Sequence, residues 1–379
     1  MHDRTLKIVE DLAEIPAAKW DALAGNNPFL SHAYFHALQA SGCVTSEVGW
    51  LPQFITLWQD EALVGAMPLF IKSHSFGEFV FDWAWAEAYH QHGLRYYPKL
   101  VCTVPFTPVT GARFLVAGSQ NADEVRGFLL DEALQLAKDM GVSSLHCLFL
   151  NKDDTQKAKS RKMMLRQDVQ FHWQNPDYQD FDDFLSTLSR EKRKRIRQER
   201  RKVADAGIKL QCITGENATP DQWTFFAACY AHTRQQHRSP PALNIDFFQR
   251  IAASMSQNTL LVIATRDGTP IASALNFFTE DVLYGRSWGT FEFHSGLHFE
   301  TCYYQAMAFC IAHGIKTFEG GAQGEHKLAR GFLPVTTRSA HWLAHPKFSN
   351  AVEEYLQCET DAISEYVDEL NERSPFKKT

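Results

Sequence analysis

The spacing of hydrophobic and polar positions changes in the same order twice along this 379-residue chain. Residues 50–72 alternate and then become largely apolar, with a polar interruption at Gln59-Asp60-Glu61, which predicts two strands joined by a turn. Residues 121–141 carry apolar side chains at helical spacing and end in glycine, which predicts a helix. The apolar segment 143–150 predicts the strand that follows this helix.

The second half of the chain repeats this order. Residues 259–278 predict two strands around an Asp-Gly turn, and residues 282–291 predict a third strand. Residues 300–314 predict a helix that ends in glycine, and residues 315–321 predict the strand after it. Because the order of elements recurs, we interpret the chain as two domains of one type, produced by a diverged duplication.

We expect the first domain to span residues 1–165 and the second to span residues 166–379. Aromatic and charged residues interrupt the repeat at about 72–114, which we interpret as an insertion in the first domain. We expect a basic amphipathic helix at 181–207 and an acidic final helix at 346–372. Hairpins alternating with helix–strand units indicate an α/β (α+β) fold.

Composition places the chain among ordinary globular proteins, since 45% of its residues are hydrophobic and 22% are charged. The formal net charge of -6 argues against a surface built throughout for nucleic acid. The predicted basic helix is the exception, because nine of the thirteen residues from Arg190 to Lys202 are Lys or Arg. This helix is either a solvated surface helix or a contact for phosphates, including those of tRNA, and charge alone does not separate the two.

The cysteines and the N-terminal sequence indicate the cellular compartment in which the protein is expected. The eight cysteines form no C-x-x-C pair, and most lie in apolar runs, which is typical of reduced, buried thiols. The N-terminal residues lack the apolar core of a signal peptide, and no apolar run is long enough to cross a membrane. We therefore expect a cytoplasmic protein without membrane insertion.

The segment 319–332, EGGAQGEHKLARGF, concentrates chemically active side chains and glycines at the end of a predicted strand. The glycines free backbone N–H groups that can hold the oxygen of a carbonyl under attack, and Lys327 can do the same with a full charge. Glu319, Glu325 or His326 could accept a proton from an attacking amine. These groups suit acyl transfer to nitrogen; the alternative is a glycine-rich turn whose charged residues face water.

The segment 72–114 is the second part of the chain that is rich in chemically active side chains. Aromatic faces beside charged side chains suit sugar rings, peptides or bases. The alternative is an insertion that packs its aromatics as a local core, and we expect both, with FVFDWAW (79–85) alternating inward and outward. The candidate ligand-binding residues are Lys72, His74, Glu78, Asp82, Trp85, Tyr96, Tyr97, Lys99 and Arg113.

Several of these motifs resemble those of a known group of enzymes. F-E-G-G at 318–321 followed by K-x-x-R-G-F-x-P at 327–334 resembles the second domain of tandem GNAT-type acyltransferases, in particular the Fem-type aminoacyltransferases of peptidoglycan bridge synthesis. The basic R-K-R-I-R at 193–197 is similar to an element of those enzymes. Segments 72–100 and 105–115, with EGGAQGEHKLARGFLP, resemble a bacterial family described as peptidoglycan biosynthesis/recognition proteins or predicted N-acyltransferases.

The resemblance covers nearly the whole chain and implies two GNAT-like domains with mixed, largely antiparallel sheets flanked by helices. It implies an N-acyltransferase that moves an acyl or aminoacyl group to an amine acceptor such as a cell-wall precursor, with Lys327 stabilising the oxyanion. It also places the acceptor near the segment 72–114. The residues expected at the acyl donor are Gly320, Gly321, Gln323, Gly324, Arg330, His294 and His298.

The donor itself stays open between aminoacyl-tRNA and acyl-CoA. GNAT enzymes that use acetyl-CoA hold its pyrophosphate on Q/R-x-x-G-x-G/A, and the nearest match, Arg286 to Phe291, lacks the final small residue. We expect no bound cofactor, and no metal at H-x-x-x-H (294–298), because a glycine separates these histidines at a loop–helix junction. The alternative function is a GNAT scaffold that recognises a peptidoglycan precursor without chemistry.

Overall fold

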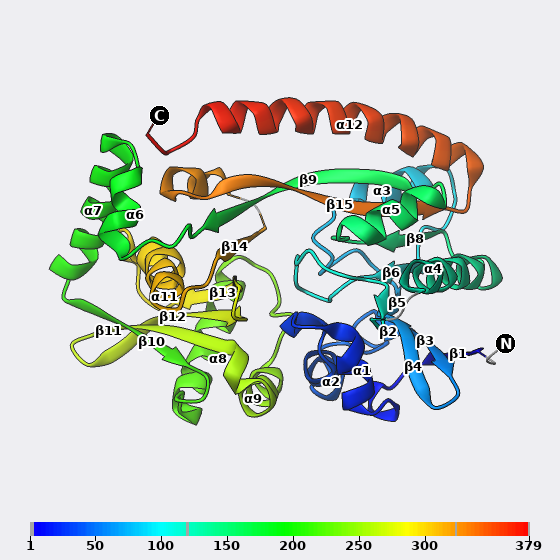
Figure 1. Ribbon diagram of the computed structural model, residues 1–379, viewed down its shortest axis with the longest axis horizontal. Helices are drawn as coiled ribbons and strands as arrows, with labels where there is room; N and C mark the ends of the chain where they lie inside the picture. The colour runs from blue at the N-terminus through cyan, green and yellow to red at the C-terminus, as the bar shows by residue number, and fades with distance from the viewer. Residues whose placement is uncertain (1–3, 119–120, 323, 378–379) are drawn as a thin grey trace. The chain divides into compact units, whose positions relative to one another are not determined.

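The computed structural model describes residues 4–118, 121–322 and 324–377 (Figure 1). The chain forms two compact units. Unit 1 comprises Met1–Asp168 and Thr336–Glu365, and unit 2 comprises Val169–Val335 and Tyr366–Thr379. No helix in the described part of the chain is both long enough and apolar enough to cross a membrane.

Unit 1 contains two sheets with helices packed beside them. Its elements are β1 (Arg4–Val9), α1 (Ala17–Ala24), α2 (His32–Ala40), β2 (Trp50–Pro52), β3 (Phe54–Gln59), β4 (Ala62–Met67), β5 (Leu69–Lys72), α3 (Trp83–Gln91), β6 (Lys99–Cys102), β7 (Leu115–Val116), α4 (Ala122–Asp139), β8 (Ser144–Cys147) and α5 (Lys152–Ser160). Two strands and one helix belong to both units: β9 (Met164–Gln174), β15 (Leu333–Leu343) and α12 (Pro346–Glu372).

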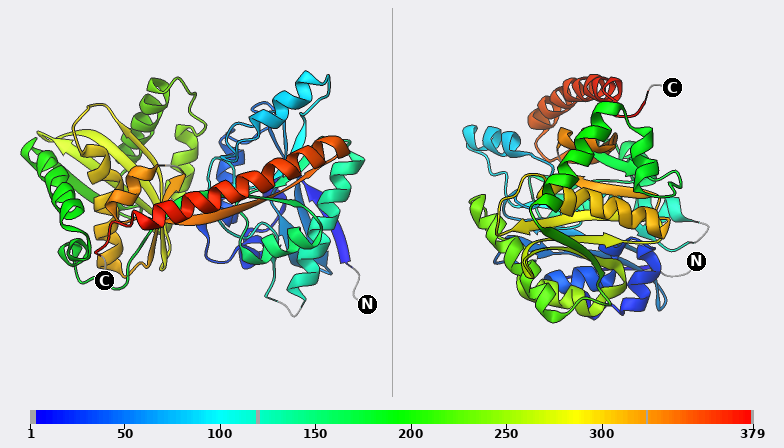
Figure 2. Two further views of the ribbon diagram at one scale, coloured as in Figure 1. Left: turned by 90° about the horizontal axis from the view of Figure 1, so that it is seen from above. Right: turned by 90° about the vertical axis from the view of Figure 1, so that its left-hand side faces the viewer.

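The remaining elements lie in unit 2. They are α6 (Phe181–Thr187), α7 (Arg190–Asp205), β10 (Ile208–Thr214), α8 (Pro220–Gln236), α9 (Ile245–Ser254), β11 (Thr259–Arg266), β12 (Thr269–Phe278), β13 (Val282–Thr290), α10 (Leu297–Phe299), a π-helical turn (Glu300–Tyr304), α11 (Gln305–His313), β14 (Thr317–Ala322) and a 3-10 helix (Glu325–Arg330). Helices α8 and α9 lie on one face of the unit 2 sheet, and α11 lies on the other (Figures 1 and 2).

The two units have strand pairings that are similar in part, although the strands of unit 1 are divided between two sheets. In unit 2, β10, β11, β12 and β13 pair antiparallel in sequence order, β13 pairs parallel with β14, and β14 pairs antiparallel with β9. In unit 1, β1, β3 and β4 are antiparallel, β6 pairs parallel with β8, and β8 pairs antiparallel with β15. The prediction of two like units with mixed, largely antiparallel sheets is therefore confirmed.

The core of unit 1 explains why the predicted helix over 121–141 forms. Helix α4 turns Val125, Leu129 and Ala133 inward, where they pack with strand residues such as Leu100 and Leu145 in one buried cluster. This apolar stripe at helical spacing is the pattern that the sequence displays. The predicted final helix also has the expected bounds, since α12 spans Pro346–Glu372.

The division of the chain differs from the sequence-based one in its second half. The predicted second domain, residues 166–379, includes residues 336–365, which belong to unit 1 in the structure. The reason is strand pairing, because Ala340–Leu343 of β15 forms an antiparallel ladder with β8. Leu343 and the first part of α12 then complete a buried cluster around Trp85 of α3.

Two local predictions were wrong. The basic helix predicted over 181–207 is two helices, because Leu188 is buried in an extended conformation and the Ser189 side chain caps the start of α7. The strand-like alternation predicted for residues 79–85 gives way to a helix, since α3 begins at Trp83. In both places a short apolar pattern was compatible with more than one backbone conformation, and tertiary packing determined which conformation formed.

Candidate functional site

The unit 2 sheet opens between β13 and β14. These parallel strands pair only at Val282–Thr317, Leu283–Phe318 and Tyr284–Glu319. Beyond that point β13 has an irregular register with β12, and β14 has one with β9. Gly321 contributes to the departure, because its φ of 77° suits glycine and few other residues. Glu319, the last residue of β14 that pairs with β13, therefore lies where these two strands separate.

Lys327 lies at this opening, on the 3-10 helix that follows β14. Its side chain is 2% exposed, and its Nζ donates to the carbonyl oxygens of Gly321 at 3.0 Å and Ala322 at 3.3 Å. A Cβ on Gly320 would come within 3.2 Å of the Lys327 Cδ, so the glycine leaves room for the lysine. Burial and the nearby Arg286 lower the pKa of Lys327 to about 8.

Three further titratable residues lie next to the opening. The Arg286 Nη2 donates to the Glu319 Oε2 at 3.4 Å, and both side chains are largely buried. His172 of β9 is directly opposite Glu319 in the strand ladder. Burial, Arg286 and Lys327 lower the pKa of His172 to about 4, so its ring is neutral at pH 7. We call Lys327, Glu319, Arg286, His172 and His326 the strand-opening cluster.

His172 is the member that the sequence did not reveal. It lies in the segment 164–174, for which no element was predicted, far in sequence from residues 319–332, and no motif surrounds it. It reaches the site because β9 pairs with β14. A lone histidine gives no signal of such a long-range pairing.

His326 extends the site toward solvent. It is exposed, and its Nε2 lies 3.0 Å from the Tyr303 hydroxyl oxygen. Burial, Lys327 and Arg330 lower the pKa of His326, whereas burial raises the pKa of Tyr303. At pH 7 the imidazole is therefore free to accept a proton and the phenol keeps its own. Tyr303 lies in the π-helical turn, a feature often found at functional sites.

Arg330 and Glu325 are committed to contacts within unit 2. Arg330 is 1% exposed, its Nη1 donates to the His326 carbonyl at 2.6 Å, and its Nη2 donates to Glu199 at 2.7 Å. Glu325 accepts from Tyr366 and Arg373, each at 2.8 Å, and these bonds lower its pKa. Arg330 therefore stabilises the turn that carries His326, and Glu325 binds that turn to residues at the end of α12.

The two histidines considered for a metal or donor contact have different neighbours. His294 lies 2.8 Å from the Glu292 Oε2, whereas the His298 ring lies 5.0 Å from the Trp288 ring and 6.2 Å from the His326 ring. Burial is the main cause that lowers the pKa of His298 to about 4. Within the described ranges, no group of three or more His, Cys, Asp or Glu residues could hold a metal ion. The predicted donor contact Gln323 lies outside the described residues.

Most of the predicted acceptor residues are inside unit 1. The Lys99 Nζ donates to Glu78 at 2.8 Å and to Asp82 at 2.5 Å, and all three side chains are at most 3% exposed. We call these three residues the buried ion cluster. Tyr96 donates to Asp82 at 2.5 Å, and Lys72 lies 3.5 Å from the centroid of the Trp50 ring. These side chains are buried, and each contacts another side chain of unit 1.

Of the other predicted acceptor residues, two are buried and two are partly exposed. Trp85 packs against His341, with ring centroids 5.0 Å apart, and the fully buried Arg113 donates to the Val109 carbonyl at 2.5 Å. His74 and Tyr97 are partly exposed, and the Tyr97 hydroxyl is bonded to Ser75 at 2.8 Å. The sequence therefore predicted a group of polar side chains in unit 1, but it did not predict which side chains of the segment 72–114 face solvent.

The ion cluster predicts a pH dependence of stability. Burial raises the pKa of Glu78 from 4.5 to about 7, so the folded protein holds this proton between these values while the unfolded chain has lost it. Glu78→Gln should therefore gain stability relative to the parent as pH rises from about 4.5 to 7, by on the order of 3 kcal/mol. Urea unfolding of both proteins across this range measures the difference. Parallel curves would contradict the raised pKa.

Comparisons with solved structures agree with this fold. The crystal structure of FemX matches with a TM-score of 0.54 and 13% identity, covering 93% of this chain and 100% of that chain. The C-terminal DUF2156 domain of a putative lysylphosphatidylglycerol synthetase from Agrobacterium fabrum matches with a TM-score of 0.53 and 9% identity, covering 90% of this chain and 95% of that one. At such identities the likeness shows the fold alone.

Sequence comparison gives the family. No curated protein matches the chain. The FemAB-like model, described as peptidoglycan biosynthesis/recognition, matches residues 11–378 and so nearly the whole chain. The chain therefore belongs to the FemAB-like peptidoglycan biosynthesis/recognition family.

Proposed function

We propose that this protein is an N-acyltransferase that moves an acyl or aminoacyl group from an activated donor to an amine of a peptidoglycan precursor. The observation that carries the proposal is the buried Lys327 ammonium, held at the point where β13 and β14 separate. A cation fixed in a largely dry site stabilises negative charge far more than one in water. The family description supports a peptidoglycan-related acceptor.

In the proposed reaction the acceptor nitrogen attacks the donor carbonyl carbon. A carbon–nitrogen bond forms, and the carbonyl electron pair moves to oxygen, which Lys327 and the freed backbone N–H groups stabilise. His326 takes the proton from the attacking amine, because it is exposed and neutral. The electron pair on the oxyanion then re-forms the carbonyl, the bond from this carbon to the donor oxygen or sulfur breaks, and His326 returns the proton to that leaving atom. Glu319 and Glu325 are weaker candidates for the base, since Arg286 and Arg373 pair with them.

The test supplies both donor classes in parallel. Purified protein is incubated with a lysine-containing stem pentapeptide and either a radiolabelled pool of aminoacyl-tRNAs or radiolabelled acetyl-CoA. Label on the peptide supports transfer and identifies the donor class. Label that stays on both donors contradicts the proposal, and binding of the peptide without transfer would favour the recognition function instead.

Helix α7 supports an RNA-linked donor. Its inner side contacts residues beside the strand-opening cluster, since Glu199 binds Arg330 and Arg200 binds Glu300 at 3.1 Å. Its outer side carries exposed cations, of which four make no ion pair within the described part of the chain: Arg190, Lys194, Arg201 and Lys202. Cations that remain available on one side of a helix suit a phosphate backbone.

Neutralising this surface should weaken binding of charged tRNA. We expect Lys194→Gln/Arg201→Gln to lower the affinity roughly tenfold near 0.1 M salt and to reduce the salt slope by about one for each lost phosphate contact. Filter binding at several salt concentrations measures both quantities. Lys138→Gln/Lys159→Gln, which removes two exposed lysines of unit 1, is the matched control. Equal losses in both variants would assign the effect to net charge and not to α7.

The cysteines support a reducing compartment. All eight are free thiols, and five of them are buried. Disulfides are rare in the cytoplasm, where charged tRNA and acyl-CoA are also made. We therefore place the proposed reaction in the cytoplasm.

A further inference from the structure

The inner side of α7 carries charged residues where its apolar stripe would be expected to continue. Ile196 and Val203 are seven residues apart on this side and are at most 1% exposed. Glu199 and Arg200 lie between them at helical spacing, so they share this side of the helix. The Glu199 side chain is only 14% exposed. A carboxylate in such a position is stable only with hydrogen-bonded partners.

Glu199 links two elements of unit 2 through its two carboxylate oxygens. Its Oε1 accepts from the Arg330 Nη2 at 2.7 Å, and its Oε2 accepts from the Tyr304 hydroxyl. Arg330 is the last residue of the 3-10 helix, and Tyr304 is the last residue of the π-helical turn. The exposed Arg195 also binds Oε1, at 3.1 Å. One side chain of α7 therefore joins the 3-10 helix to the π-helical turn.

Arg330 depends on this carboxylate. It is 1% exposed, and Glu199 is the only carboxylate within 4.0 Å of its guanidinium in the part of the chain that the structure describes. The Arg330 Cζ lies 3.3 Å from the centroid of the Phe299 ring, and its Nη1 donates to the His326 carbonyl at 2.6 Å. Without Glu199 a buried cation would lose its counter-ion, which is strongly unfavourable. We therefore expect the guanidinium, and the turn that it stabilises, to move.

The two linked elements carry Tyr303 and His326. Tyr303 belongs to the π-helical turn and His326 to the 3-10 helix. The Tyr303 hydroxyl oxygen lies 3.0 Å from the His326 Nε2. The imidazole is closely packed, because a Cβ on Gly324 would lie 2.5 Å from its Cε1. A small displacement of the 3-10 helix would therefore separate His326 from Tyr303.

We propose that Glu199 is a positioning residue for the transfer reaction: it links the 3-10 helix to the π-helical turn and so fixes His326 against Tyr303. The inference rests on the proposed function, in which His326 takes the proton from the attacking amine. No hydrogen bond joins Glu199 to His326 among the described residues, so Glu199 acts through Arg330. Its replacement should slow proton transfer and leave binding of the acceptor unchanged.

The pKa of His326 reports whether the imidazole is in place. Its charged or titratable neighbours are Lys327 and Arg330 on its own helix, Tyr303 in the π-helical turn, and His298 of α10, whose ring centroid lies 6.2 Å away. Burial, Lys327 and Arg330 lower the pKa of His326 below its ordinary value of 6.5. An imidazole that moves away from these groups into water should regain the ordinary pKa.

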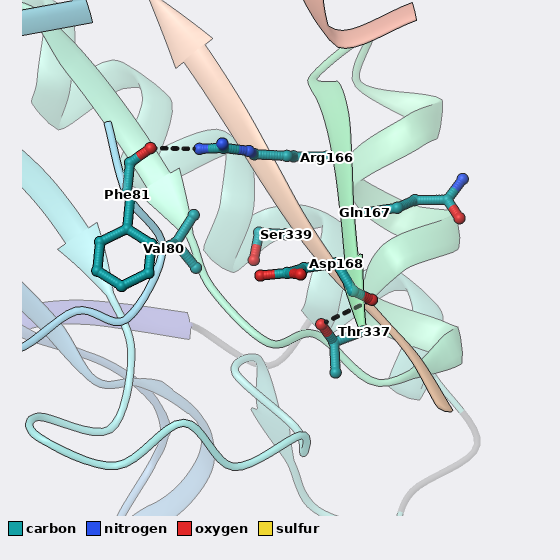
Figure 3. A pocket seen from close by; sticks show the side chains of 7 residues that line it. All are labelled: Val80, Phe81, Arg166, Gln167, Asp168, Thr337 and Ser339. Carbon is teal, nitrogen blue, oxygen red and sulfur yellow. Dashed lines mark hydrogen bonds between the residues drawn. The ribbon is translucent and has the colours of Figure 1, made fainter. Parts of the chain in front are cut away.

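Unit 1 contains a matched contact that has no part in the proposed reaction. The Arg166 guanidinium lines a small cavity of about 30 Å³ and donates to the Phe81 carbonyl at 2.6 Å (Figure 3). It also donates to Glu359 of α12 through two bonds of 2.8 Å. Like the pair of Arg330 and Glu199, this pair connects a helix carboxylate to a backbone carbonyl through one arginine. Glu359→Gln is therefore the control for Glu199→Gln.

NMR titration of the full chain, without donor or acceptor, tests the proposal. The proteins carry isotope-labelled histidine, and the His326 signal is assigned by its absence from His326→Gln. We expect Glu199→Gln to raise the pKa of His326 to about 6.5 and Glu359→Gln to leave it lowered. Tyr304→Phe removes the other bond of Glu199 without a change of charge, and it should shift the pKa in the same direction by less. Urea unfolding verifies that each variant is folded.

The peptide transfer assay gives a second readout. Glu199→Gln should lower kcat roughly 10- to 100-fold at unchanged KM for the acceptor, because the proton acceptor is displaced and the acceptor site is not. Glu199→Gln/Arg330→Gln should be no slower than Arg330→Gln, because both changes act through one ion pair. Glu359→Gln should transfer like the parent.

Three results would overturn the inference. They are a lowered pKa of His326 that persists in both Glu199→Gln and Tyr304→Phe, an equal pKa shift in Glu359→Gln, and additive losses of kcat in the double variant. A residue that served stability alone would give the first result together with easier unfolding. Because the NMR titration needs no substrate, it is independent of transfer. If the pKa shifts as expected but the parent never transfers label, the proposed function fails and the positioning of His326 by Glu199 stands.

Discussion

Replacing Lys327 by methionine is expected to slow acyl transfer by about 10²- to 10³-fold with little change in acceptor binding. Methionine keeps an unbranched side chain across Gly320 and so preserves most of the packing. It removes the only part of the side chain that carries charge, and with it the donor to the Gly321 and Ala322 carbonyls. The effect should appear in kcat and kcat/KM alike, because the ammonium acts on charge that develops during the reaction.

The pH profile gives this prediction a second readout. Lys327 carries its charge below its lowered pKa of about 8, so the parent rate should fall as pH rises through that value. Lys327→Arg should keep its residual activity above pH 8, since a guanidinium does not lose its proton there. Lys209→Met, at an exposed position of β10, is the matched control and should behave as the parent. Full activity of Lys327→Met would exclude the oxyanion role.

Replacing Lys99 by methionine is expected to destabilise the protein by about 3–5 kcal/mol. Lys99 is fully buried, and it is the shared partner of two carboxylates that are themselves at most 3% exposed. Without the ammonium, Glu78 and Asp82 must either stay charged without compensation or take up protons. Both courses cost folding free energy, and residues 76–83 lose the contacts of Glu78 and Asp82 with Lys99. Urea unfolding followed by circular dichroism measures the loss.

The controls for this prediction separate a buried ion pair from an exposed one. Arg161 pairs with Asp131 at 2.7 Å, with side chains 37% and 49% exposed, so Arg161→Met should cost at most about 1 kcal/mol. Adding Glu78→Gln and Asp82→Asn to Lys99→Met should recover part of the loss, because no buried charge then remains at these positions. A Lys99→Met protein as stable as Arg161→Met would show that the buried ion cluster does not stabilise the fold.

Local patterns in the sequence were sufficient to predict those elements that depend on residues a few positions apart in the chain. The apolar stripe of α4 and the long amphipathic α12 were predicted with nearly the bounds that the structure has, because each stripe needs only one surface to cover it. The glycine-rich segment 319–332 was also found from sequence, because such a density of glycines and charges is rare inside regular elements. These features depend on residues a few positions apart.

Burial in the segment 72–114 could not be predicted in the same way. The sequence presents Glu78 and Phe79 as ordinary neighbours, and hydrophobicity alone would place the phenylalanine inside and the glutamate outside. The structure reverses them, because Lys99 offers the carboxylates a buried partner. A cation 21 residues from Glu78 in the chain decided which side of the segment faces water.

By itself, the sequence determined two like α/β units, the family, and a candidate acyl-transfer segment around Lys327. Only the tertiary structure decided that β15 returns to unit 1, that β9 brings His172 opposite Glu319, and that Leu188 and Ser189 divide the basic segment into two helices. The physical reason is the separation in sequence between the residues that interact. Periodicity records which face of an element is apolar, whereas strand pairing and the burial of charge depend on partners that are remote in sequence and whose identity no local pattern contains.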